Sequence, residues 1–300
     1  MLMSLLCLLF SCAGPPTDAL SWREQWEILI LTEDGGIIEG IANTGNTGMY
    51  RGEGQFRANR WFTSGTPILF GMDGGPADVD VSSAHDAVRV GSALVGRFDD
   101  GEHWTMRFSN DEANAIVRID PGGPQPPLST GMSAEGQWTL ASPISNGRSH
   151  GWFTAGRRGG MFEGKSVALH RGGDGRPPGP RQTVVIMGPR VSIGLDSQGS
   201  QKLAWARIGD LDLPTSDLVF SVSESGIGTL DFGPETVLSI DLVPTGCSGT
   251  SEVHQDLSVL ERVMADFSGL ATSRTVRRAK TRFKLGEEEF SASAVIVDVE

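Results

Sequence analysis

The residues best suited to ligand binding form one short run, 149–153, with the sequence Ser-His-Gly-Trp-Phe. A polar imidazole beside two aromatic rings and a glycine can orient a mostly apolar molecule. We therefore predict that His150, Trp152 and Phe153 contact a ligand.

Tryptophans are spread over both halves of the chain, and barrels that hold apolar ligands line their interiors or mouths with such rings. Trp104 and Trp205 therefore join the predicted ligand contacts. The alternative is that these tryptophans pack in a hydrophobic core. It applies to Trp26, Trp61, Trp104, Trp138, Trp152 and Trp205.

Four carboxylates in a glycine-containing segment, Asp73, Asp78, Asp80 and Asp86, could bind Ca²⁺ through oxygen atoms. They lack EF-hand or repeat spacing, so a solvated acidic loop is the favoured interpretation. The zinc motifs HExxH and CxxC are absent, as are the nucleophile elbow, the Walker loop and the dinucleotide fingerprint. We expect no metal site and no cofactor, and motifs alone assign no catalytic residue.

The elements that position these residues are predicted to be strands. Residues 26–45 contain two β-rich runs joined by Glu-Asp-Gly-Gly, in which the glycines allow the positive φ of a tight hairpin turn. Similar turns recur along the chain, which has 40 Gly but few helix-forming runs. The predicted fold class is all-β, with one antiparallel barrel or sandwich in each half of the chain.

A Pro- and Gly-rich segment divides the two expected domains. Residues 121–127 read Pro-Gly-Gly-Pro-Gln-Pro-Pro, which cannot supply the hydrogen-bond donors of a strand. We expect a signal peptide and tether over 1–19, an N-terminal domain over 20–120, a linker over 121–135 and a C-terminal domain over 136–300.

The C-terminal region is predicted to contain a helix and a closing hairpin. Apolar residues spaced three and four apart predict an amphipathic helix over 251–271, which either flanks a barrel or binds a partner or membrane. Arg278, Lys280, Arg282 and Lys284 then alternate with less polar residues. This basic face is either a solvated surface or a contact for anionic headgroups.

The N-terminus predicts export. An apolar run over 1–11 is too short to span a bilayer, which needs about 20 residues, but suits a signal peptide. At the end of this run, residues 9–13 read Leu-Phe-Ser-Cys-Ala, which resembles a bacterial lipobox. Cys12 is therefore the predicted lipid anchor, and the membrane is a predicted partner. An envelope lipoprotein is expected; a secreted or periplasmic soluble protein is the alternative.

The net charge of −12 argues against a general nucleic-acid binder, because phosphate backbones are held by clustered basic residues. Oligomeric state stays open. No internal disulfide is expected, since Cys247 is left alone once Cys7 and Cys12 are assigned to the signal peptide and the anchor.

Several segments together resemble the double lipocalin-like family that includes carotenoid 1,2-hydratase, the AttH-like proteins and the yeast survival-factor-like proteins. Residues 26–37 are similar to that family's opening hairpin, and 85–91 and 99–108 to its mid-domain strands. The resemblance covers about 20–245. It implies two tandem lipocalin-like antiparallel β-barrels and an apolar ligand that is lipid or isoprenoid-like.

Hydratase-like members of that family carry two His, a Trp and a Gly on a strand that faces the cavity. Residues 167–174, Val-Ala-Leu-His-Arg-Gly-Gly-Asp, occupy the comparable place with one His and glycine. The resemblance makes His170 the candidate catalytic residue. The main hypothesis is a carrier of an apolar ligand, and the alternatives are a hydratase or cyclase using His170, His150 or Asp196, and a carbohydrate-binding or structural envelope protein.

Overall fold

The opening hairpin forms where the sequence predicts it. Strand β1 (Trp22–Thr32) pairs with β2 (Ile37–Thr47), and Gly35 takes a φ of +93° in the turn. The Asp34 carboxylate accepts hydrogen bonds from the Thr32 hydroxyl at 2.5 Å and from the Gly36 amide at 3.1 Å. This turn fixes the register of the hairpin.

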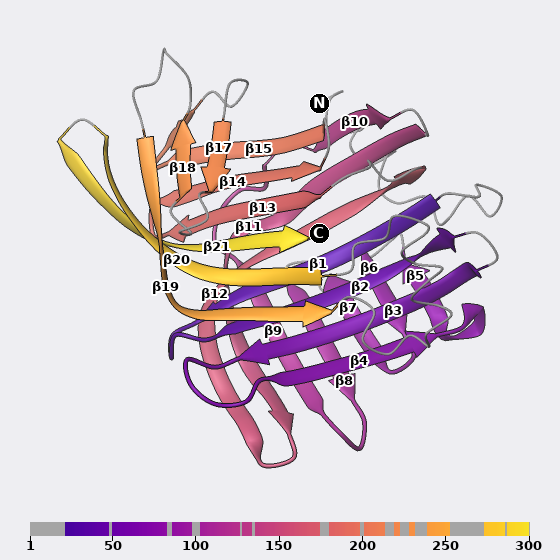
Figure 1. Ribbon diagram of the computed structural model, residues 1–300. Coiled ribbons are helices and arrows are strands. Elements are labelled where there is room, and N and C mark those ends of the chain that lie inside the picture. The colour runs from indigo at the N-terminus through magenta and orange to yellow at the C-terminus, as the bar shows by residue number, and fades with distance from the viewer. Residues whose placement is uncertain are drawn as a thin grey trace.

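The computed structural model describes residues 22–47, 50–82, 86–97, 103–126, 128–133, 136–174, 180–198, 201–213, 219–222, 228–231, 239–252, 273–285 and 287–299. Nearly all of these residues lie in two antiparallel sheets (Figure 1).

The first sheet has 12 strands among the described residues, in the order β4-β3-β2-β1-β12-β11-β9-β8-β7-β6-β5, with β10 paired to β11. Its further elements are β3 (Tyr50–Trp61), β4 (Ile68–Gly74), a 3₁₀ turn (Pro76–Asp78), β5 (Val79–Ser82), β6 (Ala87–Val90), β7 (Ala93–Arg97), β8 (Trp104–Ser109), β9 (Asn114–Pro121), β10 (Ser129–Ser133), β11 (Gly136–Ala155) and β12 (Arg158–Asp174). Strands β5 and β6 also contact β3 and β4, so this sheet curls into a nearly closed barrel.

The second sheet has nine strands in the described chain, in the order β16-β15-β14-β13-β21-β20-β19-β18-β17. They are β13 (Arg181–Gly188), β14 (Val191–Gln198), β15 (Gln201–Ile208), β16 (Leu211–Asp212), β17 (Val219–Val222), β18 (Gly228–Asp231), β19 (Ser239–Glu252), β20 (Ser273–Leu285) and β21 (Glu288–Val299).

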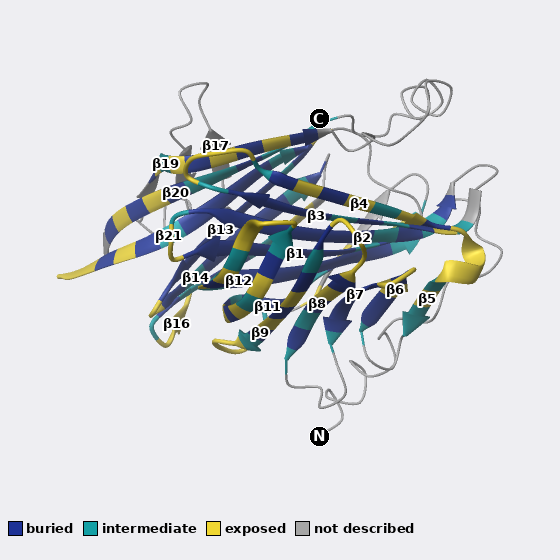
Figure 2. Ribbon diagram, turned by 90° about the horizontal axis from the view of Figure 1, so that it is seen from below, coloured by how far each residue is buried: buried dark blue, intermediate teal, exposed yellow. Residues whose placement is uncertain are grey.

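The described residues form three hydrophobic clusters, and the strands that carry them contain many buried residues, drawn dark blue (Figure 2). One lines the interior of the first sheet, one lies on the corresponding face of the second sheet, and the third lies between the two sheets. Strand β1 is buried on both faces, because Ile28 and Ile30 point into the barrel while Leu29 and Leu31 face the second sheet. Its continuous apolar run reflects this double burial.

The predicted helix over 251–271 is not supported. Ser251 and Glu252 end strand β19, the described residues include no α-helix, and 253–272 lie outside them. Local spacing alone suggested the helix, and the strand pairing of β19 with β20 takes its first residues instead.

The strands up to β12 belong to the first sheet, and the strands from β13 onward belong to the second. Strands β11 and β12, which follow the predicted linker at 121–135, hydrogen-bond to β9 and β1 of the first sheet. The domain limits stay a prediction.

The basic face of β20 has two different environments. Arg278 is half-buried and donates hydrogen bonds to the carbonyl oxygens of Thr32, at 2.6 Å, and Gly36, at 3.3 Å. Lys280 and Arg282, on the same face, are exposed. Headgroup binding by this face stays a prediction, with Arg278 already engaged by the β1–β2 turn.

Within the described part of the chain, none of the helical structure is long and apolar enough to cross a bilayer.

Candidate active site

Strands β1 and β12 run side by side and place polar groups on both of their faces. Trp26 is the register partner of His170, and Glu24 that of Gly172. Because side chains alternate along a strand, Glu24, Trp26 and His170 share the face toward the first barrel's interior, whereas Glu27 and Arg171 share the opposite face.

His170 is held by two neighbours. Its Nδ1 lies 2.8 Å from Asp86 Oδ1, and its ring stacks on Trp26 with the centroids 4.5 Å apart and the planes 18° apart. The Trp26 indole also donates to Asp86 Oδ1 at 3.4 Å. This hydrogen bond to Nδ1 leaves Nε2 as the basic atom of a neutral His170.

Asp86 adopts an uncommon backbone conformation for a residue other than glycine, with φ +46°. Its carbonyl oxygen accepts a hydrogen bond from the Arg97 amide at 3.2 Å. At Gly96, a Cβ would lie 2.3 Å from that same oxygen, so the glycine allows β7 to approach. Burial alone would raise the pKa of Asp86, but the hydrogen bond and charge of His170 outweigh it and hold that pKa below its usual value.

Glu24 completes the group on this face. Its Oε1 lies 4.0 Å from His170 Nε2, and Oε2 is buried with no hydrogen-bond partner among the residues that the structure describes. Burial raises the pKa of Glu24 to about 7; the His170 charge lowers it in part and the Asp86 charge adds to the rise. A Cβ at Gly172 would lie 2.8 Å from Glu24 Cγ, so this glycine makes room for the carboxyl group.

We call Glu24, Trp26, Asp86 and His170 the His170 cluster. It combines a carboxylic acid that keeps its proton near neutral pH with a histidine oriented by a second, ionised carboxylate. Such a pair can give a proton to one atom of a substrate and remove one from another. The cluster therefore has the parts of an acid–base catalyst.

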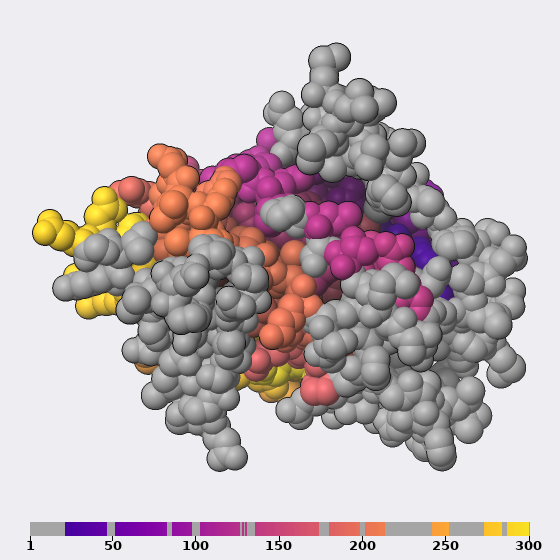
Figure 3. Space-filling view, turned by 90° about the horizontal axis from the view of Figure 1, so that it is seen from above, coloured from indigo at the N-terminus to yellow at the C-terminus, as the bar shows by residue number. Residues whose placement is uncertain are grey.

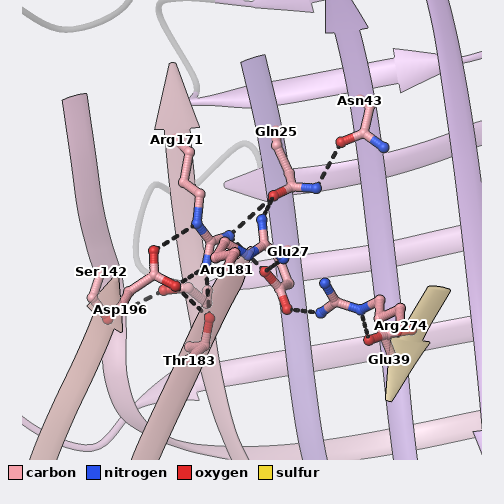
Figure 4. Close-up of polar contacts among 11 residues, drawn as sticks. Gln25, Glu27, Glu39, Asn43, Ser142, Arg171, Arg181, Thr183, Asp196 and Arg274 are labelled. Atoms are coloured by element: carbon pink, nitrogen blue, oxygen red, sulfur yellow. Dashed lines mark hydrogen bonds and ion pairs between the residues drawn. The ribbon is translucent and has the colours of Figure 1, made fainter. Parts of the chain in front are cut away.

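The opposite face of the same two strands carries charges buried between the sheets (Figure 4). Arg171 binds both oxygens of Asp196 at 2.9 Å and Glu27 Oε2 at 2.5 Å. Arg274 binds Glu27 and, through Nε at 2.5 Å, Glu39. The inter-sheet charge network consists of Glu27, Glu39, Arg171, Arg181, Asp196 and Arg274.

The network is balanced, since three carboxylates meet three guanidinium groups. Burial alone would raise the pKa of Glu27, but Arg274, Arg171 and Arg181 outweigh it and hold that pKa far below its usual value. Arg171 likewise keeps the pKa of Asp196 low against its burial. Asp196 is therefore ionised and bound to Arg171, rather than acting as an acidic partner of His170.

The structure separates the ligand contacts predicted from the sequence. The side chains of His150 and Trp152 are exposed on the outer face of β11, whereas Phe153 and Trp104 are buried in the barrel interior. Trp205 packs between the sheets and donates its indole N–H to Ser192 Oγ at 3.1 Å. Cys12 lies outside the described residues, so lipidation stays a prediction.

The acidic segment is also divided. Asp73 pairs with Arg57 at 3.1 Å, and Asp86 with His170. No group of three or more candidate metal ligands occurs among the residues that the structure describes.

Sequence reasoning missed the roles of Glu24 and Asp86. Glu24 lies near the start of β1, so its alternation with Trp26 and Ile28 was the available signal of an inward-facing carboxylate. Asp86 was considered only as a calcium ligand. Its contact with His170 spans 84 positions and depends on closure of the barrel.

A separate groove of about 520 Å³ lies at one end of the second sheet, lined by Arg190, Ile208, Asp210, Leu211, Glu288 and Phe290. The yellow β20–β21 hairpin projects beside the orange strands of this sheet (Figure 3). Arg190 and Glu288 form an exposed ion pair at 3.2 Å. The groove lacks the buried acid and base of the His170 cluster.

Solved structures with the same fold are found, although the sequences are distant. CghA with Sch210972 has a TM-score of 0.61 and 13% identity, with 97% of this chain and 94% of that chain covered. Kievitone hydratase from Nectria haematococca has a TM-score of 0.60 and 12% identity, with 97% and 91% covered. An AttH-like protein from Nitrosomonas europaea has a TM-score of 0.58 and 10% identity, with 96% and 97% covered.

No family model matches the chain, and no curated protein matches its sequence. The structural matches confirm the resemblance to the double lipocalin-like family at the level of the fold. The carrier hypothesis is contradicted, because one of the matched structures is that of a kievitone hydratase and an acid–base group lies on the barrel face of β1 and β12.

Proposed function

We propose that this chain is an enzyme of the hydratase or cyclase type that acts on a carbon–carbon double bond of an isoprenoid-like substrate. The observation that carries the proposal is the position of Glu24, with a pKa of about 7, 4.0 Å from His170 Nε2. The similarity in fold to kievitone hydratase supports the reaction class.

In the proposed hydration, protonated Glu24 gives its proton to one carbon of the double bond, and the other carbon becomes a cation. A water molecule bonds to that carbon and loses a proton to His170 Nε2, while ionised Asp86 stabilises the imidazolium. The proton then returns from His170 to Glu24. The net change is the addition of one water molecule, and both residues regain their starting states.

Cyclisation differs in one step. A second double bond of the substrate attacks the cation in place of water, and His170 removes a proton from the product cation. Exclusion of water from the reacting carbon decides between the two outcomes. The buried position of Glu24, with 7% of its side chain exposed, suits either reaction, since it keeps the carboxyl protonated.

The proposal predicts incorporation of solvent oxygen into an alkene. Purified protein is incubated in oxygen-18-labelled water with geraniol, squalene or lycopene, and the products are analysed by mass spectrometry. Gain of one labelled water shows hydration, and a product of unchanged mass but altered retention shows cyclisation. If all three probes are recovered unchanged, the proposed reaction on isoprenoids is refuted.

A further inference from the structure

The interior of the first barrel contains other unsatisfied polar groups besides Glu24, and Trp104 carries one of them. Trp104 is 1% exposed, and its indole nitrogen has no hydrogen-bond partner among the described residues. A buried N–H group without an acceptor is costly, so native structures seldom retain one without a reason. By contrast, the indole N–H of Trp26 donates to Asp86, and that of Trp205 donates to Ser192.

Trp104 lies on the same side of the barrel as Asp86. In the β7–β8 register it is the partner of Arg97, whose backbone amide donates to the Asp86 carbonyl. Asp86 directly precedes β6, and Trp104 is the first residue of β8, which lies two strands from β6 in the sheet. Met106 and Phe108 continue its buried face, and all three belong to the hydrophobic cluster that contains Trp26.

A further polar group occupies the same row of the sheet. Trp104 pairs with Ile119 of β9, and Ile119 pairs with Ser149 of β11. Ser149 is buried, and within the described part of the chain its hydroxyl oxygen also has no hydrogen-bond partner. This row of an otherwise apolar barrel wall thus presents two polar groups to which the described side chains offer no partner.

We infer that the Trp104 indole N–H recognises an oxygen acceptor on the substrate, so the substrate class is an isoprenoid-like alkene that also carries a carbonyl group. This inference rests on the proposed function, since it places the substrate beside the His170 cluster. The oxygen binds Trp104, and the double bond is thereby set against Glu24 and His170. An apolar hydrocarbon would leave the N–H unsatisfied and bind more weakly.

The test compares geranylacetone, an isoprenoid ketone, with the matched hydrocarbon in which a methylene replaces the carbonyl. Affinities are measured by calorimetry for the parent and for Trp104→Phe, which keeps a ring but removes the N–H. The parent is expected to bind the ketone about tenfold more tightly, and the variant to bind both probes equally. Trp205→Phe, at the interface between the sheets, is the matched control and should keep the preference.

Three results would overturn the inference: no preference for the ketone in the parent, an unchanged preference in Trp104→Phe, or loss of the preference in Trp205→Phe as well. The comparison within the parent needs no variant, so a folding defect in Trp104→Phe leaves the test decisive. Because the titration reports affinity and not product formation, the result can be interpreted whether or not the labelled-water assay detects a reaction.

Discussion

Arg171→Met is expected to lower the free energy of unfolding by about 3–5 kcal/mol, the cost of removing one partner from a buried ion pair. The substitution keeps most of the side-chain volume but removes the two hydrogen bonds that Arg171 donates to Asp196 and leaves Glu27 with one guanidinium fewer. Chemical denaturation measures the change. Arg207→Met, which breaks an exposed ion pair with Asp212, is the control and should leave the unfolding midpoint nearly unchanged.

A second substitution separates charge from packing. Arg171→Met leaves three carboxylates against two guanidinium groups in the network. Adding Asp196→Asn restores the balance, so the double variant should be more stable than Arg171→Met alone. If Arg171→Met is as stable as the parent, the network contributes nothing to holding the sheets together. If the double variant is the less stable, lost packing rather than unpaired charge explains the effect.

The second large effect is expected on catalysis. His170→Gln should slow product formation by about 10²–10⁴-fold, the usual contribution of a general acid or base. Glutamine can still hydrogen-bond to Asp86 but cannot accept a proton from water. Rates are measured on whichever isoprenoid probe gives product with the parent. His150→Gln, on the outer face of β11, is the matched histidine control and should keep the parent rate.

His170 could instead be a buried histidine that only supports the fold. In that case His170→Gln would lower the unfolding midpoint and reduce activity only in proportion to the folded fraction. A stable variant that retains the parent rate would remove His170 from the mechanism. Equal losses in His170→Gln and His150→Gln would also contradict the assignment, since the two residues lie on opposite sides of the barrel wall.

Much of the fold could be predicted because strands encode their faces locally. Gly35, the acidic turn and the flanking isoleucines predicted the opening hairpin, which the structure confirms. The resemblance also predicted His170 as the candidate catalytic residue, and the structure places it in the barrel beside two carboxylates. Alternation did not reveal that both faces of β1 are buried, although its unbroken Ile-Leu-Ile-Leu run was the available signal.

The rest depended on contacts that no local pattern encodes. Arg274 and Glu27 are 247 positions apart, and they meet only because the second sheet packs on the outside of β1 and β2. The spacing that suggested a helix from Ser251 was equally local, and pairing with β20 takes the start of that segment into β19. The sequence prediction grouped three near neighbours, His150, Trp152 and Phe153. Side chains alternate along β11, however, so Phe153 lies on the opposite face of the strand from the other two.

In the proposed mechanism Glu24 supplies the proton, and the pH dependence of kcat/KM tests this role. Glu24 must be protonated to act, so kcat/KM of the parent should fall about tenfold per pH unit above about pH 7. Glu24→Gln should show a low kcat/KM with no break near that pH. A parent profile without a break between pH 5 and 9, or the same break retained in Glu24→Gln, would contradict the claim.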